Sequence, residues 1–175
     1  MDSVRERAAR VRLVVFDVDG VLTDGRLILG ERGEEYKVFH SRDGQGMVML
    51  RETGLHVAVI SGRSSPVVAE RMASLGIDFV YQGLSAKLPV FVELLQRLKL
   101  SAAQAAFVGD DLPDLAIMSR AGLAVAVADA HPEVIRHAHW CTKLPGGRGA
   151  AREVCDLVLE AHGLLHGQHE RYRAG

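Results

Sequence analysis

Two carboxylates, Asp17 and Asp19, stand two positions apart directly after the apolar run 13–16. A run rich in β-branched residues is typical of a buried strand in a parallel sheet. The carboxyl ends of such strands are where α/β folds form their binding and catalytic sites. Because two unpartnered acids are costly to bury there, the pattern predicts that a metal ion or a substrate uses them.

Polar groups follow three later apolar runs in the same way. They are Ser61, Gly62 and Arg63 after run 56–60, Lys87 after run 79–81, and Asp110, Asp111 and Asp114 after run 105–108. Because the carboxyl ends of parallel strands lie along one edge of a sheet, we expect these groups to face one small volume.

Phosphoryl transfer suits this set of groups, because it requires mainly positioning and charge compensation. Asp17 can attack phosphorus to give an aspartyl-phosphate, while Asp19 can protonate the leaving oxygen and later activate water. Mg²⁺ prefers oxygen ligands, which the carboxylates of Asp17 and Asp110 and the carbonyl of Asp19 can supply. Lys87 and Ser61 can bind the phosphate oxygens.

The elements that must position these groups alternate between strands and helices. The predicted strands are 13–16, 56–60, 79–81, 105–108 and 123–127, and the predicted helices are 46–53, 66–75, 88–98, 114–120, 133–137 and 150–161. This alternation predicts an α/β fold with a doubly wound, Rossmann-like parallel sheet in a single domain spanning residues 1–175.

One segment, about 25–39, interrupts the alternation with two extended runs around a Gly-rich turn, which predicts a β-hairpin after the first strand. The connections are too short for a separate lid, so a neighbouring subunit is expected to help close the site. The polar, basic segment 166–175 is expected to be a flexible tail. The loop 146–149 lacks the Lys-Ser/Thr of a P-loop, and we interpret it as a helix entry or a close approach to a neighbouring backbone.

Composition excludes several classes of protein. The 175 residues carry a formal net charge of −1, which argues against a nucleic-acid binder. No apolar run approaches the roughly 18 residues needed to span a bilayer, so no membrane partner is expected. The charged N-terminal segment lacks an apolar signal core, which predicts a cytoplasmic protein. We interpret the two cysteines as buried apolar residues.

Four motifs together resemble the haloacid dehalogenase superfamily of phosphohydrolases: DVDGVLTDG, ISGR, SAK and GDDLPD. Four further segments resemble the 3-deoxy-D-manno-octulosonate 8-phosphate phosphatase family: YKVFHSRDGQGM, YQG, AVADAHP and GGRGAAREVCDL. This resemblance extends from about Val11 to Leu165. Members of that family lack a cap domain and form tetramers in which the hairpin of one subunit helps to close its neighbour's site.

The resemblance implies a Mg²⁺-dependent phosphatase of an acidic sugar phosphate that serves lipopolysaccharide biosynthesis. It implies Asp17 as nucleophile and Asp19 as general acid and base, with Ser61 and Lys87 on the phosphate. The implied Mg²⁺ ligands are Asp17, Asp19 and Asp110, with Asp111 and Asp114 in support. The implied substrate contacts are His40, Ser41, Arg42, Asp43, Gly44, Gly62, Arg63, Arg71 and Lys87.

Two positions bear on the identity of the sugar. Arg63 stands where relatives that act on nine-carbon, sialic-type sugar phosphates tend to carry Glu, and an Arg can pair with the carboxylate of an acidic sugar. His40 stands where many family members carry Asn, and the two side chains differ in reach. The alternative to a role in sugar binding is that Arg63 and Arg71 are ordinary surface groups and that His40 is an ordinary loop residue.

Three other functions remain open from the sequence. A sialic-type sugar 9-phosphate phosphatase, or a broader sugar phosphatase, would use the same chemistry. A non-catalytic tetramerising module would need neither Asp19 nor Lys87. A receiver-type signalling domain also places acids and a lysine at strand ends, but the spacing of Asp17 and Asp19 favours a phosphatase.

Overall fold

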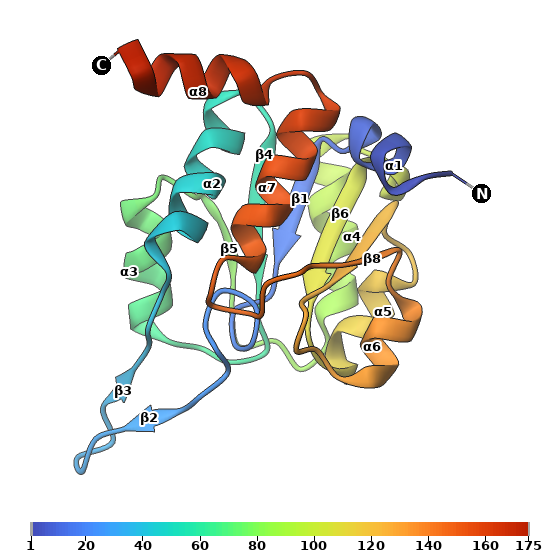
Figure 1. The fold of residues 1–175 in the computed structure, drawn as a ribbon. Helices are drawn as coiled ribbons and strands as arrows, with labels where there is room; N and C mark the ends of the chain where they lie inside the picture. Colours follow the sequence, from blue (N-terminus) through green and yellow to red (C-terminus); the bar gives the residue numbers. More distant parts are fainter. Residues whose placement is uncertain (1, 175) are drawn as a thin grey trace.

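The computed structural model describes residues 2–174, which form a six-stranded parallel sheet beside a small hairpin (Figure 1). The strand order is β5-β4-β1-β6-β7-β8. The bounds are β1 Leu13–Phe16, β4 His56–Ile60, β5 Phe79–Tyr81, β6 Ala105–Gly109, β7 Leu123–Ala126 and β8 Trp140–Cys141. The predicted doubly wound sheet is confirmed, and its order reverses between β1 and β6, where such folds place their ligands.

Helices cover both faces of the sheet (Figure 1). Helices α1, α2 and α7 pack together on one face, and α4, α5 and α6 lie on the other. The bounds are α1 Val4–Arg10, α2 Ser41–Glu52, α3 Pro66–Ser74, α4 Lys87–Leu98, α5 Leu115–Met118, α6 Pro132–His137, α7 Ala150–Ala161 and α8 Leu165–Ala174, with 3₁₀ turns at Ala102–Gln104 and Leu112–Asp114.

Helix α7 is amphipathic, with one apolar face that packs against the rest of the protein. Its buried residues recur at helical spacing, namely Ala150, Ala151, Val154, Cys155, Val158 and Leu159. This stripe packs against α2, where Gly46 allows a close approach. A Cβ at Gly46 would lie 2.9 Å from the Arg152 side chain and 3.0 Å from that of Cys155.

Two short elements and the start of a third, longer one were missed by the sequence prediction. Helix α1 was not predicted, although Ser3 and Glu6 form a capping box at its start. Helix α2 begins at Ser41 rather than Gly46, because the His40 side chain accepts a hydrogen bond from the Arg42 amide and so caps it. Strand β8 has two residues, too few to produce a periodic signal.

The C-terminal segment differs from the flexible tail expected over 166–175. Helix α8 is present there as far as Ala174, and the last residue lies outside the described part of the chain. Gln168 is buried, Tyr172 accepts a hydrogen bond from Gln45, and Arg171 pairs with Glu52 on α2. These contacts with the body of the protein account for an ordered helix in a segment whose polarity suggested otherwise.

The predicted hairpin is present as β2 (Ile28–Leu29) and β3 (Glu35–Tyr36), which project from the body (Figure 1). No cap domain accompanies it within residues 2–174. Its large apolar side chains are exposed: Leu27, Ile28, Leu29, Tyr36 and Val38. No described helix has the length and apolar character needed to cross a membrane.

The loop 146–149 packs directly on the loop that follows β1. The Gly147 amide donates a hydrogen bond to the Val21 carbonyl at 2.9 Å, and Gly146 lies against the backbone of Gly20. The loop thus approaches a backbone of this same chain, rather than the neighbour's backbone that the sequence suggested, and it leads directly into α7. Any side chain at Gly146 would displace the loop that carries the first two acids.

We predict that Gly146→Ala destabilises the protein by about 1–3 kcal/mol, because its Cβ would overlap the Gly20 carbonyl oxygen. The melting temperature should fall by several degrees in a domain of this size. Gly167→Ala on α8 is the matched control, since its Cβ would meet no atom within 4 Å. Equal melting temperatures for the two variants would contradict the prediction.

Candidate active site

A cavity of about 340 Å³ opens at the carboxyl end of the sheet, at the point where the strand order reverses. It collects the polar groups that follow β1, β4, β5 and β6. The predicted site residues that line it are Asp17, Asp19, Ser61, Gly62, Arg63, Lys87, Asp110, Asp111 and Asp114. The structure thus brings together the polar groups that were predicted to meet because they follow neighbouring strands.

Lys87 is the buried cation at the floor of this cavity. Its Nζ lies 2.9 Å from Asp17 Oδ1 and 2.7 Å from Asp114 Oδ1. Burial alone lowers the pKa of Lys87, but the charges of Asp17 and Asp114 outweigh burial and raise the pKa above its ordinary value. The lysine therefore stays protonated at neutral pH and fixes the Asp17 carboxylate.

Asp114 organises the loop after β6. While one of its oxygens binds Lys87, the other accepts hydrogen bonds from the amides of Asp110 at 3.0 Å and Asp111 at 3.3 Å. It is 1% exposed. Both oxygens are thus engaged within the protein, which suits a residue that positions the site.

Asp110 is the carboxyl of the cavity that the protein compensates least. Its Oδ1 is buried and has no hydrogen-bond partner among the described residues. Burial, together with Asp114, Asp17 and Asp111, raises the pKa of Asp110 to about 8, and burial and Asp114 raise that of Asp17 to about 6. A buried carboxylate in this state is costly unless a cation joins it.

A divalent cation fits this donor set. Carboxylate oxygens from Asp17, Asp110 and Asp114 lie within 4.8 Å of one another, and hard cations such as Mg²⁺ take oxygen ligands. This group includes Asp114 and leaves out the side chain of Asp19. The donor expected from Asp19 was its backbone carbonyl, and a cluster of side-chain oxygens does not test that expectation.

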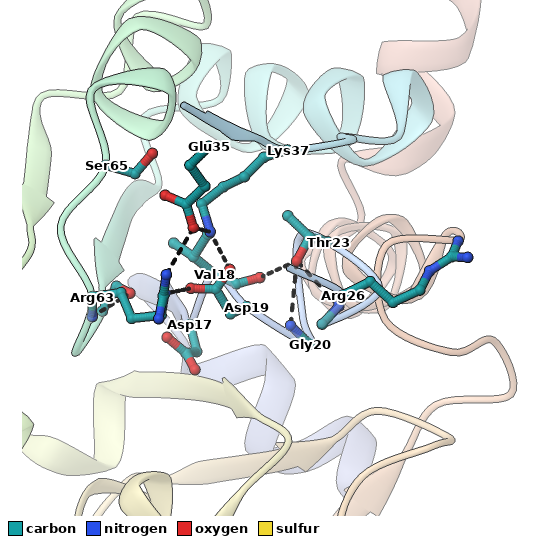
Figure 2. Close-up of polar contacts among 12 residues, drawn as sticks. Asp17, Val18, Asp19, Gly20, Thr23, Arg26, Glu35, Lys37, Arg63 and Ser65 are labelled. Carbon is teal, nitrogen blue, oxygen red and sulfur yellow. Dashed lines mark hydrogen bonds and ion pairs between the residues drawn. The ribbon is translucent and has the colours of Figure 1, made fainter. Parts of the chain in front are cut away.

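The Asp19 side chain instead faces a separate set of charges (Figure 2). Lys37 pairs with its Oδ1, and Arg63 Nε lies 3.7 Å from its Oδ2. Glu35 Oε1 lies 3.2 Å from Lys37 Nζ and 2.9 Å from Arg63 Nη2. Hydrogen bonding to Arg63, assisted by Lys37, lowers the pKa of Glu35 below its ordinary value.

Lys37 and Glu35, which contact the cavity residues Asp19 and Arg63, were missed by the sequence analysis. They stand in the hairpin, outside every strand end of the main sheet, and so the argument from strand ends could not find them. One signal was available: Glu35 and Lys37 are two apart in an extended segment, so their side chains share one face.

Two backbone turns complete the cavity. Ser61 is buried, and its hydroxyl oxygen accepts a hydrogen bond from the Arg63 amide at 3.3 Å. Thr23 is also buried, and its hydroxyl oxygen accepts from the amides of Gly20 and Gly25. These bonds hold the loops after β4 and β1 and leave Ser61 at the cavity wall.

The remaining predicted sugar contacts do not line this cavity. His40, Asp43, Gly44 and Arg71 lie together around a small hollow between α2 and α3. Ser41 and Arg42 are exposed at the start of α2. Of the predicted substrate contacts, the structure therefore brings Gly62, Arg63 and Lys87 into the cavity and places the others outside it.

Asp43 has a structural role, because its side chain connects α2 to the start of α7. Its buried carboxylate accepts hydrogen bonds from the amides of Gly149 at 3.2 Å and Arg152 at 2.8 Å, at the start of α7. Burial raises the pKa of Asp43 despite these bonds. The residue links α2 to the loop that supports Gly20.

Comparisons with known proteins agree with this geometry. Residues 80–152 match the haloacid dehalogenase-like hydrolase family. A 3-deoxy-D-manno-octulosonate 8-phosphate phosphatase from Yersinia pestis is 48% identical over 166 residues, covering 95% of this chain and 89% of that protein.

Two solved structures superpose on nearly the whole chain. A probable yrbi family phosphatase from Pseudomonas syringae has a TM-score of 0.96 and 49% identity, covering 98% of each chain. A 3-deoxy-D-manno-octulosonate 8-phosphate phosphatase from Moraxella catarrhalis, in complex with magnesium, phosphate and KDO, has a TM-score of 0.94 and 36% identity, covering 97% of each chain. The chain belongs to the 3-deoxy-D-manno-octulosonate 8-phosphate phosphatase family of haloacid dehalogenase-like hydrolases.

Proposed function

We propose that this protein is a Mg²⁺-dependent phosphomonoesterase that hydrolyses 3-deoxy-D-manno-octulosonate 8-phosphate to the free sugar acid and phosphate. The arrangement of Asp17 and Asp19 carries the proposal. One acid is fixed by a buried lysine beside the other strand-end carboxylates, and its neighbour two positions on faces a separate set of cations. The Moraxella relative was solved with magnesium, phosphate and KDO, which supports both cofactor and substrate.

In the first step, the Asp17 carboxylate attacks phosphorus and forms the aspartyl-phosphate. Lys87 holds one Asp17 oxygen and places a positive charge beside the phosphoryl group. The bond from phosphorus to the sugar oxygen breaks, and that oxygen takes the proton of Asp19. Ser61 lies at the cavity wall, where its hydroxyl can donate to a phosphate oxygen.

In the second step, Asp19 acts as a base. Its carboxylate accepts a proton from a water molecule, and the resulting hydroxide attacks the phosphorus of the aspartyl-phosphate. Phosphate leaves, and Asp17 returns to its carboxylate form beside Lys87. Asp19 thereby regains the proton that the leaving sugar removed, which balances the cycle.

Mg²⁺ would be held by the carboxylates of Asp17 and Asp110 and the carbonyl of Asp19. When bound, it supplies positive charge that screens the phosphate from the surrounding carboxylates. Asp114 and Asp111 support this arrangement through the loop after β6: Asp114 accepts from its amides, and Asp111 caps the turn that follows.

The identity of the substrate can be tested by comparing the rates of hydrolysis of several sugar phosphates. The values of kcat/KM should be measured with the octulosonate 8-phosphate, a sialic-type sugar 9-phosphate and neutral sugar phosphates. A clear preference for the first supports the assignment, with Arg63 at the cavity wall as the group that meets an acidic sugar. Comparable values on unrelated phosphates would replace it with a broad sugar phosphatase.

The proposal includes a homotetramer and a cytoplasmic location. The five apolar side chains exposed on the projecting hairpin support assembly, because a soluble monomer rarely exposes such a cluster. The cavity opens beside the hairpin, and Leu27 lines it. The free thiols Cys141 and Cys155 agree with a reducing compartment.

Asp17→Asn should abolish turnover, lowering kcat at least about 10³-fold, because an amide cannot form the aspartyl-phosphate. The fold should be retained, since the amide oxygen can still accept a hydrogen bond from Lys87. Activity and melting temperature should be measured together. Substantial activity in a folded variant would rule out this mechanism.

Mg²⁺ should raise the melting temperature of the metal-free protein, by an amount equivalent to about 2.7 kcal/mol at one hundred times its Kd. In Asp110→Asn this response should largely disappear, because a principal ligand is lost. Thermal denaturation in EDTA and in Mg²⁺ measures both effects. An equal response in the two proteins would remove Asp110 from the metal site.

Asp110→Asn should also show how much the buried carboxylates destabilise the protein when no metal is bound. The folded pKa values of about 8 for Asp110 and about 6 for Asp17 exceed the unfolded value near 4. The metal-free protein should therefore lose stability as pH rises from about 4 to about 8. In EDTA, Asp110→Asn should gain in melting temperature over the wild type between pH 5 and pH 8, and a constant difference would contradict this account.

Leu29→Asp should disrupt the assembly, because it places a charge among the exposed apolar residues of the hairpin. Light scattering should show a smaller species, and activity should fall if a neighbour closes the site. Ile135→Asp on α6, also an exposed apolar position, is the control that should leave assembly unchanged. An unchanged mass for Leu29→Asp would contradict the hairpin interface.

A further inference from the structure

The side chain of Lys37 is buried although its two neighbours in the chain are exposed. Its side chain is 2% exposed, while the residues on either side, Tyr36 and Val38, are 57% and 65% exposed. A lysine is rarely buried to this degree unless its ammonium group is fully used. Here it pairs with Asp19 and Glu35, the two carboxylates that face it (Figure 2).

We propose that Lys37 is the positioning residue for Asp19, holding its carboxylate in place for proton transfer to and from the substrate. The inference rests on the proposed phosphatase function and assigns a role to a residue of the hairpin. Each of the two acids then has its own lysine, with Lys87 on Asp17 and Lys37 on Asp19. Two different elements supply these lysines, α4 and the hairpin.

The contacts fix Asp19 from both sides (Figure 2). Lys37 binds Oδ1, and Arg63 approaches Oδ2 at 3.7 Å, a distance that leaves this oxygen available. Glu35 joins the two cations through one oxygen. The Asp19 side chain remains 18% exposed to the cavity, so the freer oxygen can meet the leaving group.

Lys37 takes no part in the bond changes. The proton that reaches the ester oxygen comes from Asp19 while the phosphorus to sugar-oxygen bond breaks, and water later restores it. Lys37 transfers no proton in either step and acts by orientation alone. Without it, the Asp19 side chain loses the contact on Oδ1 and can leave the position from which the transfer occurs.

The alternative of a plain surface ion pair does not fit the burial. The nearby pair of Arg26 and Asp24 has its arginine 73% exposed and is a solvated contact of that kind. A direct contact of Lys37 with substrate is the other alternative, and its signature would be a change in KM rather than in kcat.

The test compares substrates whose leaving groups need a proton to different degrees. A sugar phosphate releases an alkoxide, which must be protonated, whereas p-nitrophenyl phosphate releases a stable phenolate and needs little help. Because Asp19 also acts as base in the second step, which is common to both substrates, the first step is measured alone, as the rate of leaving-group release in a single turnover. We expect Lys37→Met to lower this rate about 10- to 100-fold on the sugar phosphate and only a few-fold on p-nitrophenyl phosphate. Lys37→Arg, which keeps a cation, should recover part of the loss.

The matched control is Arg120→Met, which removes an exposed cation outside the hairpin and should leave both rates unchanged. Melting temperatures of all variants should be recorded, so that a loss of fold is recognised. If Lys37→Met does not fold, the comparison passes to Lys37→Arg and Lys37→Gln. Equal losses on the two substrates, or a rise in KM alone, would overturn the inference.

A second measurement tests whether Lys37 acts through Asp19. In an Asp19→Asn background, Lys37→Met should change the residual rate on p-nitrophenyl phosphate less than about two-fold, because its target is already absent. An additional loss as large as in the wild type would overturn the inference. Absence of activity in the wild type itself would instead contradict the proposed function.

Discussion

The concentration of negative charge at one end of the sheet is the constraint on which this structure depends. The strand order reverses between β1 and β6, so the acids that follow these strands meet. Asp17, Asp110 and Asp114 crowd together, and the ammonium of Lys87 contacts Asp17 and Asp114. The raised pKa values of Asp17 and Asp110 show that one lysine does not compensate this charge. The site is built to receive a cation and an anionic group together.

The rest of the fold holds the loops of this cavity against that repulsion. The Asp17 amide bonds the Val108 carbonyl at 3.0 Å, which ties the ends of β1 and β6 together. On the other side, Gly146 lies against Gly20 because it lacks a side chain. Asp43, in α2, accepts hydrogen bonds from the amides at the start of α7. The loop 146–149 leads into α7, so Asp43 also supports this loop beside the active site.

The parts predicted from the sequence were those that leave a local signal. Apolar runs gave the five longer strands, and the acids and lysine at their ends were expected to meet because parallel strands share an edge. The start of α2 and the helix over Leu165–Ala174 were not predicted, since they depend on the His40 cap and on contacts of the tail with α2. Contacts between distant segments cannot be read from periodicity, and for the same reason Lys37 escaped notice.

The two acids of the DxD pattern are chemically alike and two residues apart, yet the proposed reaction requires them to do different work. Their surroundings separate them: Asp17 is buried beside other carboxylates, while Asp19 is partly exposed and surrounded by Lys37 and Arg63. The cations around Asp19 come from the hairpin and from the loop after β4, both at the open rim of the cavity. In a fold without a cap, the hairpin therefore carries the charge that distinguishes the second acid from the first.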